Sequence, residues 1–176
     1  MKSGTAHEER LRVLHIGKYF PPHAGGMETY LRDLMVVQHR QGLNVTALVH
    51  ASRATTFDQD RQVDALNSTS FTVRLAARWF NVGFVPVSPF FWLSAIKLIR
   101  KFKPHIIHIH HPNLSAAWLL LLPSARRIPW VAHWQSDILT PSSSRFVKLC
   151  YAFYRPFEQR LLNHSSVIFG TSRDYI

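Results

Sequence analysis

The sequence predicts an α/β domain built on a mostly parallel sheet with helices on both faces. Short apolar runs typical of strands alternate with longer segments in which apolar residues recur at helical spacing. The first strand, helix and second strand fit within about forty residues, the size of a parallel crossover unit. The 176 residues suit one domain, and 47% hydrophobic residues are enough to build its core.

The amino-terminal segment opens with a strand and a helix. The run RLRVLHIG (10–17) is nearly continuously apolar at its centre, as in a strand covered on both faces. From Met27 the apolar residues recur every three or four positions, which predicts a helix that stops at Gly42. Between the two lies the loop FPPHAGG, in which Gly25 and Gly26 would let the backbone approach a ligand closely.

The remaining elements continue the alternation. Compact or alternating apolar runs predict strands at residues 44–50, 69–76, 105–111, 128–134 and 165–172. Helical spacing predicts helices over residues 88–103, 115–122 and 144–164, with Pro156 as a candidate kink in the last. The polar segment 51–68 predicts a loop.

The charge of the chain is strongly positive, with a formal net charge of +11. No aspartate or glutamate lies between Ala65 and Ser136, a stretch that carries eight lysines and arginines. A surface this basic attracts nucleic acid, anionic lipid or phosphorylated substrates, and the alternative is a solvated face. A non-enzymatic basic domain that binds nucleic acid is therefore a rival function. Its motifs are missing, however, and we expect no nucleic-acid partner.

The compartment can be inferred from what the sequence lacks. No apolar run approaches the ~20 residues that a membrane-spanning helix needs. The first residues do not show the pattern of a signal peptide. Cys150 is the single cysteine, so no internal disulfide can form, which fits a reducing cytosol; its aromatic helical surroundings predict a core position.

Polar residues follow the predicted strands, and in open α/β sheets ligands bind beyond the carboxyl ends of the strands. A glycine loop leading into a helix amino terminus suits a phosphate, although it matches neither GxGxxG nor GxxxxGKS. A carboxylate in the first helical turn suits a sugar hydroxyl. The candidate substrate-binding residues are Gly25, Gly26, Glu28, His110, Asn113, Asp137 and Ser172, and His133 is a further polar residue at the end of a predicted strand.

Closely spaced histidines raise the question of a metal. They are His105, His108, His110 and His111, and the second and third would share one strand face. No carboxylate or cysteine lies nearby to complete a site, and the HExxH pattern is absent. We therefore expect packing or substrate contact from these side chains, with no metal and no cofactor.

Four motifs in a fixed order resemble a known family. They are FPPHAGGMETYLRDL, PHIIHIHHPN, IPWVAHWQSDIL and RPFEQRLLNHSSVIFGTS. Together they resemble the N-terminal domain of retaining glycosyltransferases of family four, which have the GT-B architecture. The resemblance runs from Leu11 to the end and implies a single Rossmann-like domain over residues 1–176, without the C-terminal donor-binding domain. It departs from the family at His105, where members usually have aspartate.

The resemblance also implies an activity. Such enzymes move a sugar from a nucleotide sugar to an acceptor with retention, and similar bacterial enzymes build lipid-linked sugars and lipopolysaccharide. The implied partners are a nucleotide-sugar donor, a glycan or lipid-linked acceptor and the anionic inner face of the plasma membrane, where the protein would be peripheral and cytoplasmic. The resemblance makes His133 the candidate catalytic residue, in contact with the transferred sugar. Gly25 and Gly26 would contact the diphosphate, and Asp137 falls where many members have an HSD run. The 176 residues alone are expected to be inactive.

Overall fold

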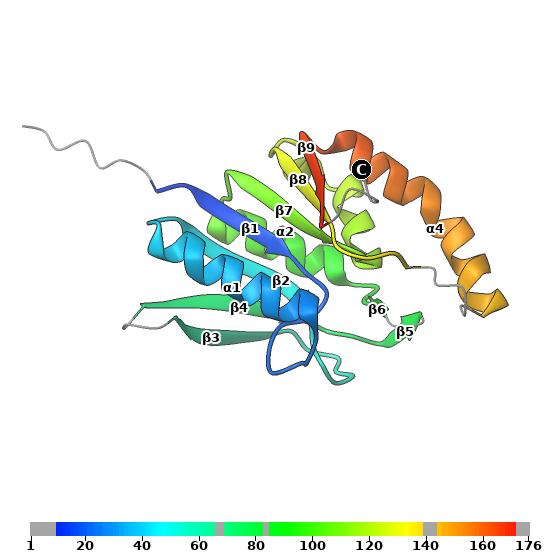
Figure 1. Ribbon diagram of the computed structural model, residues 1–176, viewed down its shortest axis with the longest axis horizontal. Helices are drawn as coiled ribbons and strands as arrows, with labels where there is room; N and C mark the ends of the chain where they lie inside the picture. Colours follow the sequence, from blue (N-terminus) through cyan, green and yellow to red (C-terminus); the bar gives the residue numbers. More distant parts are fainter. Residues whose placement is uncertain (1–9, 66–68, 83–84, 139–143, 172–176) are drawn as a thin grey trace, which may run out of the picture.

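A mixed seven-stranded sheet forms the centre of the computed structural model, which describes residues 10–65, 69–82, 85–138 and 144–171 (Figure 1). The strand order is β3-β4-β2-β1-β7-β8-β9. All neighbours are parallel except β3 and β4. The predicted, mostly parallel sheet is confirmed. The strands are β1 Arg12–Ile16, β2 Asn44–His50, β3 Gln59–Ala65, β4 Thr69–Ala76, β7 Ile106–His111, β8 Trp130–Trp134 and β9 Val167–Gly170.

Helices cover both faces of the sheet, as predicted. On one face α1 packs against β1, β2 and β4, with Leu31 and Met35 in the core. The other face is covered by the remaining helices, which enclose a second core around Phe91 and Trp130. The helices are α1 Gly26–Arg40, α2 Phe91–Phe102, the 3-10 helix η1 Leu114–Leu121, α3 Pro123–Arg126 and α4 Arg145–His164.

Side-chain alternation along β1 explains how the two cores arise. Successive side chains of a strand point to opposite faces. Val13 therefore joins the core beneath α1, whereas Leu14 and Ile16 join the core beneath α2. His15 lies on the α1 face and is fully buried. An apolar run thus contains one polar residue that the sheet hides from water.

The segment 51–68 was expected to be a loop, and this prediction is wrong for β3. Residues Gln59–Ala65 pair antiparallel with β4 at the edge of the sheet. The strand lacks a hydrophobic pattern because both of its faces are largely exposed, with Val63 only partly buried. Charged edge strands of this kind resist pairing with other chains. The short hairpin of β5 (Phe80–Val82) and β6 (Val85–Val87) was not predicted either.

The helix boundaries follow the sequence signals closely. Helix α1 ends at Arg40, and Gly42 follows with a φ of 87°, a left-handed conformation that favours glycine. Helix α4 continues through Pro156. Helix α2 starts at Phe91, two residues after the proline expected near its start.

Candidate functional site

Four histidines meet on the α1 face of the sheet. They are His15 of β1, His108 and His110 of β7, and His133 of β8. Strand register places His15 beside His108, and His110 beside His133. The ring centroids of His110 and His133 are 5.7 Å apart, and those of His108 and His110 are 4.4 Å apart. Because these strands are parallel, His110 and His133 lie toward the carboxyl edge of the sheet, where ligands bind in this class of fold.

Aromatic side chains and one amide cover His133. Its ring lies 5.0 Å from the ring of Tyr30 in α1 and 4.4 Å from that of Phe169 in β9, between ring centroids. The Gln135 side-chain nitrogen lies 3.5 Å from His133 Nδ1. The side chain is consequently only 3% exposed. His110 and His133 are each the next-to-last residue of their strand and do not belong to the loops that follow.

A chain of hydrogen bonds links the histidines to two glutamines. His15 Nε2 lies 2.8 Å from Gln38 Oε1, which can only accept, so His15 donates from Nε2. His15 Nδ1 then accepts from His110 Nε2 at 3.1 Å. His110 Nδ1 is left to accept from the Gln135 amide at 3.3 Å. With the Gln135 amide in this orientation, His15 and His110 each carry their proton on Nε2.

Burial keeps these rings neutral. Desolvation lowers the pKa of His15 to about 4 and that of His108 to about 2, in each case below the ordinary value of 6.5. Burial also places the pKa of His110 well below its ordinary value and lowers that of His133. Near neutral pH the cluster therefore offers lone pairs and N–H donors without a positive charge.

The glycine loop lies at the start of α1. Gly25 is the N-cap residue, and Glu28 in the first helical turn is buried at 4% exposure. A β-carbon on Gly25 would clash with the Glu28 carboxylate, so the carboxylate fills the space that the glycine leaves. A β-carbon on Gly26 would meet nothing within 4 Å. Gly26 is exposed, and the first backbone N–H groups of a helix have no partner within the helix itself.

Two contacts show which predicted residues the fold brings together. Ser136, just after β8, donates to the Met27 sulfur at 3.8 Å, so the glycine loop and the end of β8 are neighbours. Thr171, just after β9, donates to the Gln135 carbonyl at 3.4 Å. The glycine loop, His110 and His133 therefore belong to one region of the carboxyl edge.

Asn113 and Asp137 are placed differently. Asn113 is fully buried and donates from Nδ2 to the Gly17 carbonyl at 2.8 Å, which ties the loop after β7 to the end of β1. Asp137 is exposed and accepts from the Trp134 indole at 3.1 Å. Ser172 lies outside the described residues. Substrate contacts by these three residues stay predictions.

A hollow of about 370 Å³ lies on the β3–β4 side of the sheet, away from β7 and β8, and its lining reaches the starts of β2 and β4. Arg74 there donates from Nε and Nη2 to the two Asp60 oxygens, each at 2.7 Å. The polar residues that line it are His39, Asn44, Thr46, Asp60, Gln62, Ser70, Thr72, Arg74 and Lys101.

A family model settles the kinship of the chain. The model described as "Glycosyl transferase 4-like domain" matches residues 25–175. The chain belongs to the glycosyl transferase 4-like domain family. The family assignment that the motifs suggested is confirmed, and the matched range includes Gly25, Gly26 and the three carboxyl-terminal motifs.

A solved structure shares the fold of this glycosyl transferase 4-like domain. Sucrose-phosphate synthase from Thermosynechococcus elongatus matches with a TM-score of 0.63 and 12% identity over 90% of this chain and 42% of its own. The catalytic domain of starch synthase IV from Arabidopsis thaliana, bound to ADP and acarbose, gives a TM-score of 0.47 and 16% identity over 73% of this chain and 34% of its own. The chain thus spans less than half of either structure. No curated protein matches it.

Sequence reasoning missed three contributors to the site of this glycosyltransferase domain. His15, Gln38 and Tyr30 reach the histidine cluster from β1 and α1. The available signal was a histidine inside an otherwise apolar strand, because a buried histidine needs partners. Nothing in the sequence pattern specifies which partners those are.

Proposed function

We propose that the chain is the acceptor-binding half of a retaining glycosyltransferase that moves a hexose from a nucleotide sugar to a glycan acceptor. The observation that carries the proposal is the placement of His110 and His133 beside the start of α1, at the carboxyl edge of parallel strands. Membership of the glycosyl transferase 4-like family supports it. The acceptor would be lipid-linked and the product a cell-surface polysaccharide or lipopolysaccharide.

The chemistry asks little of the protein beyond placement. The acceptor oxygen forms a bond to the anomeric carbon while the bond from that carbon to the donor phosphate breaks, on the same face of the sugar. The acceptor proton passes to the departing phosphate oxygen. His133 would orient the transferred sugar. The backbone N–H groups at the start of α1, which begins at Gly26, would face the negative diphosphate. Neutral imidazoles suit hydrogen bonds to sugar hydroxyls.

Replacement of His133 by alanine tests the proposal in the transferase in which this domain is joined to a donor-binding domain. We expect kcat to fall about 100-fold, comparable to the loss of one positioned hydrogen-bonding group. Arg74→Ala, on β4 beside the edge strand β3, is the control and should keep kcat. A His133→Ala enzyme with near-normal kcat and a native melting curve would remove the assigned role.

The membrane part of the proposal depends on which apolar side chains are exposed. Helix α2 combines aromatic and basic residues, as helices that lie on membranes do, but it buries Phe91, Leu98 and Ile99 in the core. Helix α4 instead exposes an apolar stripe: Phe146, Leu149, Phe153 and Phe157 are 45 to 73% exposed. These positions follow helical spacing, so they share one side of α4. No helix in the described part of the chain is long and apolar enough to cross a bilayer.

Charge favours an anionic membrane as the surface that covers this stripe. Helix α4 exposes four basic residues, and its single acidic residue, Glu158, is buried. The basic residues are Arg145, Lys148, Arg155 and Arg160. Each basic group near an anionic leaflet is worth about 1 kcal/mol. Peripheral binding to the inner face of the plasma membrane follows as the proposed location.

Vesicle co-sedimentation tests this placement. The chain should bind vesicles that contain phosphatidylglycerol, and high salt should release it. Phe146→Ser combined with Phe153→Ser should weaken binding about tenfold or more, because two exposed rings no longer insert. Phe57→Ser is the matched control, since Phe57 is 75% exposed but lies in a different region. Equal binding to neutral vesicles, or equal loss in the control, would contradict the proposal.

A further inference from the structure

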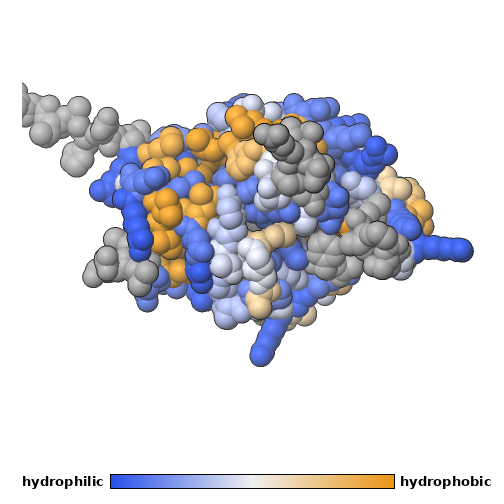
Figure 2. All heavy atoms as spheres, viewed as in Figure 1, coloured by the Kyte–Doolittle hydropathy of each residue, from blue (hydrophilic) through white to orange (hydrophobic). Residues whose placement is uncertain are grey.

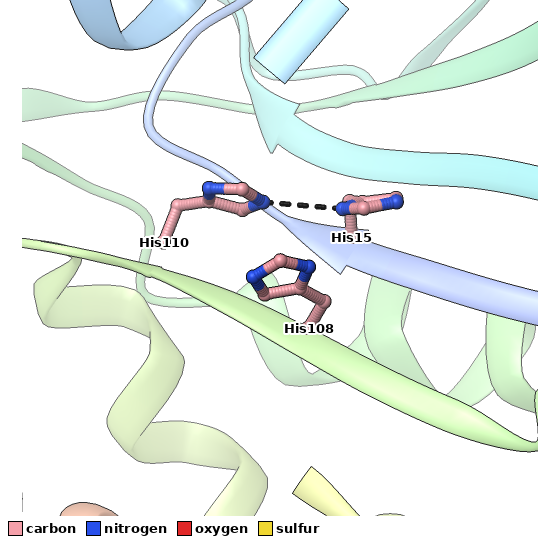
Figure 3. A group of neighbouring side chains, drawn as sticks. All are labelled: His15, His108 and His110. Carbon is pink, nitrogen blue, oxygen red and sulfur yellow. Dashed lines mark hydrogen bonds between the residues drawn. The ribbon is translucent and has the colours of Figure 1, made fainter. Parts of the chain in front are cut away.

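Three of the buried histidines form a compact group of possible metal ligands. His15, His108 and His110 each offer a ring nitrogen, and these three nitrogens lie within 4.8 Å of one another. The three side chains are 0, 6 and 2% exposed. Figure 3 shows the His108 ring beside the hydrogen-bonded pair of His15 and His110, with the three rings gathered at one point between β1 and β7. The sequence could not reveal this group because His15 lies 95 residues from His110.

We propose that His15, His108 and His110 bind one divalent transition-metal ion of the kind that prefers imidazole, with Zn²⁺ as its representative. His15 Nδ1 and His110 Nε2 are 3.1 Å apart. Two imidazole nitrogens on a tetrahedral zinc, each at about 2.0–2.1 Å, lie roughly 3.3–3.4 Å apart, so a small separation of the rings would admit the ion. His108 Nε2 is buried and has no hydrogen-bond partner among the described residues.

The outer shell suits a metal as well. A ligating histidine usually donates its second ring N–H to a carbonyl or carboxylate. Gln38 Oε1 already accepts from His15 Nε2 at 2.8 Å, which leaves His15 Nδ1 as the ligand. The Gln135 amide lies 3.3 Å from His110 Nδ1, and its own Oε1 is buried without a partner in the described part of the chain. Rotation of that amide by a half turn would let Oε1 accept from His110 Nδ1 and leave Nε2 as the ligand.

The sequence-based objection to a metal was the lack of a further ligand near the histidine run. The fold supplies that ligand as His15, from a neighbouring strand. Three neutral imidazoles leave a fourth position for water or a small anion, as in zinc sites with three protein ligands. The ion would fix β1 to β7 and hold His110 in place. The inference rests on this geometry and does not depend on the transferase proposal.

Calorimetric titration of ZnCl₂ into the chelator-treated chain, purified without a histidine tag, is the test. We expect one ion per chain. His15→Gln and His108→Gln should each weaken binding about 100-fold or more. Gln38→Leu, which removes the outer-shell acceptor, should weaken it about 10- to 100-fold. His111→Gln is the matched control, because His111 is equally buried in β7 but points to the opposite face and should leave binding unchanged.

Two further readouts separate metal binding from folding. Co²⁺ bound in place of Zn²⁺ should give the intense visible absorption of a four-coordinate site. The melting temperature of the wild-type chain should rise with Zn²⁺, and that of His108→Gln should not, each compared with its own metal-free state. If the wild-type chain shows no saturable site, the group is a hydrogen-bonded cluster only. If the His15 and His108 variants bind zinc as tightly as the wild-type chain, the zinc is held by surface histidines. Either result overturns the proposal.

Discussion

Two regions of the sheet hold polar residues in opposite ways. On the edge strand β3 and its neighbour β4, Asp60 and Arg74 form a two-bond ion pair in which the Asp60 side chain is 43% exposed. At the carboxyl edge and just inside it, His110 and His133 are almost fully buried. Buried atoms there also lack partners among the described residues, including Glu28 Oε1 and Gln135 Oε1.

This difference identifies the region in which the fold keeps polar atoms at a cost in stability. Exposed ion pairs are satisfied by each other and by water, and contribute little to stability. Buried polar atoms without partners cost about 1–3 kcal/mol each, so a fold that needed only stability would not keep them. The hollow of about 370 Å³ lies beside β3 and β4, and one buried atom without a partner, His39 Nδ1, belongs to its lining. Strand direction selects the carboxyl ends of β7 and β8 instead.

Figure 2 adds a second contrast on the face that carries α1. Hydrophobic side chains gather there beside the helix. Exposed apolar residues on this part of the surface include Val37 of α1 and Val167 of β9, 49 and 51% exposed. Strand β8 shows the contrast: Val131 on this face is partly buried, whereas Trp130 and Ala132 on the other face are fully buried, Trp130 in the larger core.

Acid should destabilise the carboxyl edge at a higher pH than it affects the ion pair of Asp60 and Arg74. His50 ends β2, is 1% exposed and has its pKa lowered by burial to about 4. The unfolded chain takes up a proton below its pKa of about 6.5, whereas the folded chain resists it until about 4. The free energy of unfolding should therefore fall by about 3 kcal/mol from this residue alone between those values.

The control for this effect is Asp60. Its pKa lies below the ordinary value because of Arg74, so its smaller contribution is present above about pH 4 and is lost only below that. Urea unfolding from pH 7 to pH 4 should show a flatter pH dependence for His50→Gln. Asp60→Asn should leave the slope of that window unchanged. An equal slope for wild type and His50→Gln would contradict the assigned burial.

Gly26→Ala should separate stability from function at the carboxyl edge. Gly26 begins α1 with open space around it and without a left-handed backbone, so alanine should stabilise the fold by about 0.5 kcal/mol. The methyl group should nevertheless raise KM for the donor, because it stands where the diphosphate would approach. Gly42→Ala is the matched control: its φ of 87° predicts lower stability and an unchanged KM. An unchanged KM in Gly26→Ala would remove the phosphate role of the loop.

The sheet and its helices were predictable because burial on two faces leaves clear patterns. An apolar run predicts a strand covered on both faces, at Val13, Leu14 and Ile16, and a glycine predicts the end of a helix, at Gly42. Strand β3 escaped prediction because an exposed edge strand carries no apolar pattern. The site was only partly predictable: strand ends point to His110 and His133, but the bonds of His15 depend on which strands become neighbours.

Gly25 shows the same limit at a single residue. The sequence predicts room for a ligand, and the structure places the Glu28 carboxylate in that room. Side-chain packing within one helical turn decides this, and residue spacing alone does not encode it. Helices α2 and α4 are a similar case, since the apolar face of α2 is core and the apolar stripe on α4 is exposed.

Titration of the isotope-labelled chain with uridine, guanosine and adenosine diphosphate sugars, followed by backbone amide shifts, tests the central claim most directly. The account predicts weak binding, millimolar or worse, because a donor-binding domain would supply most contacts. It also predicts that the shifts gather at the carboxyl edge, on the amides of Gly26, Met27 and Gln135. Micromolar affinity, or shifts gathered around Asp60 and Arg74, would show that the site lies elsewhere in the fold.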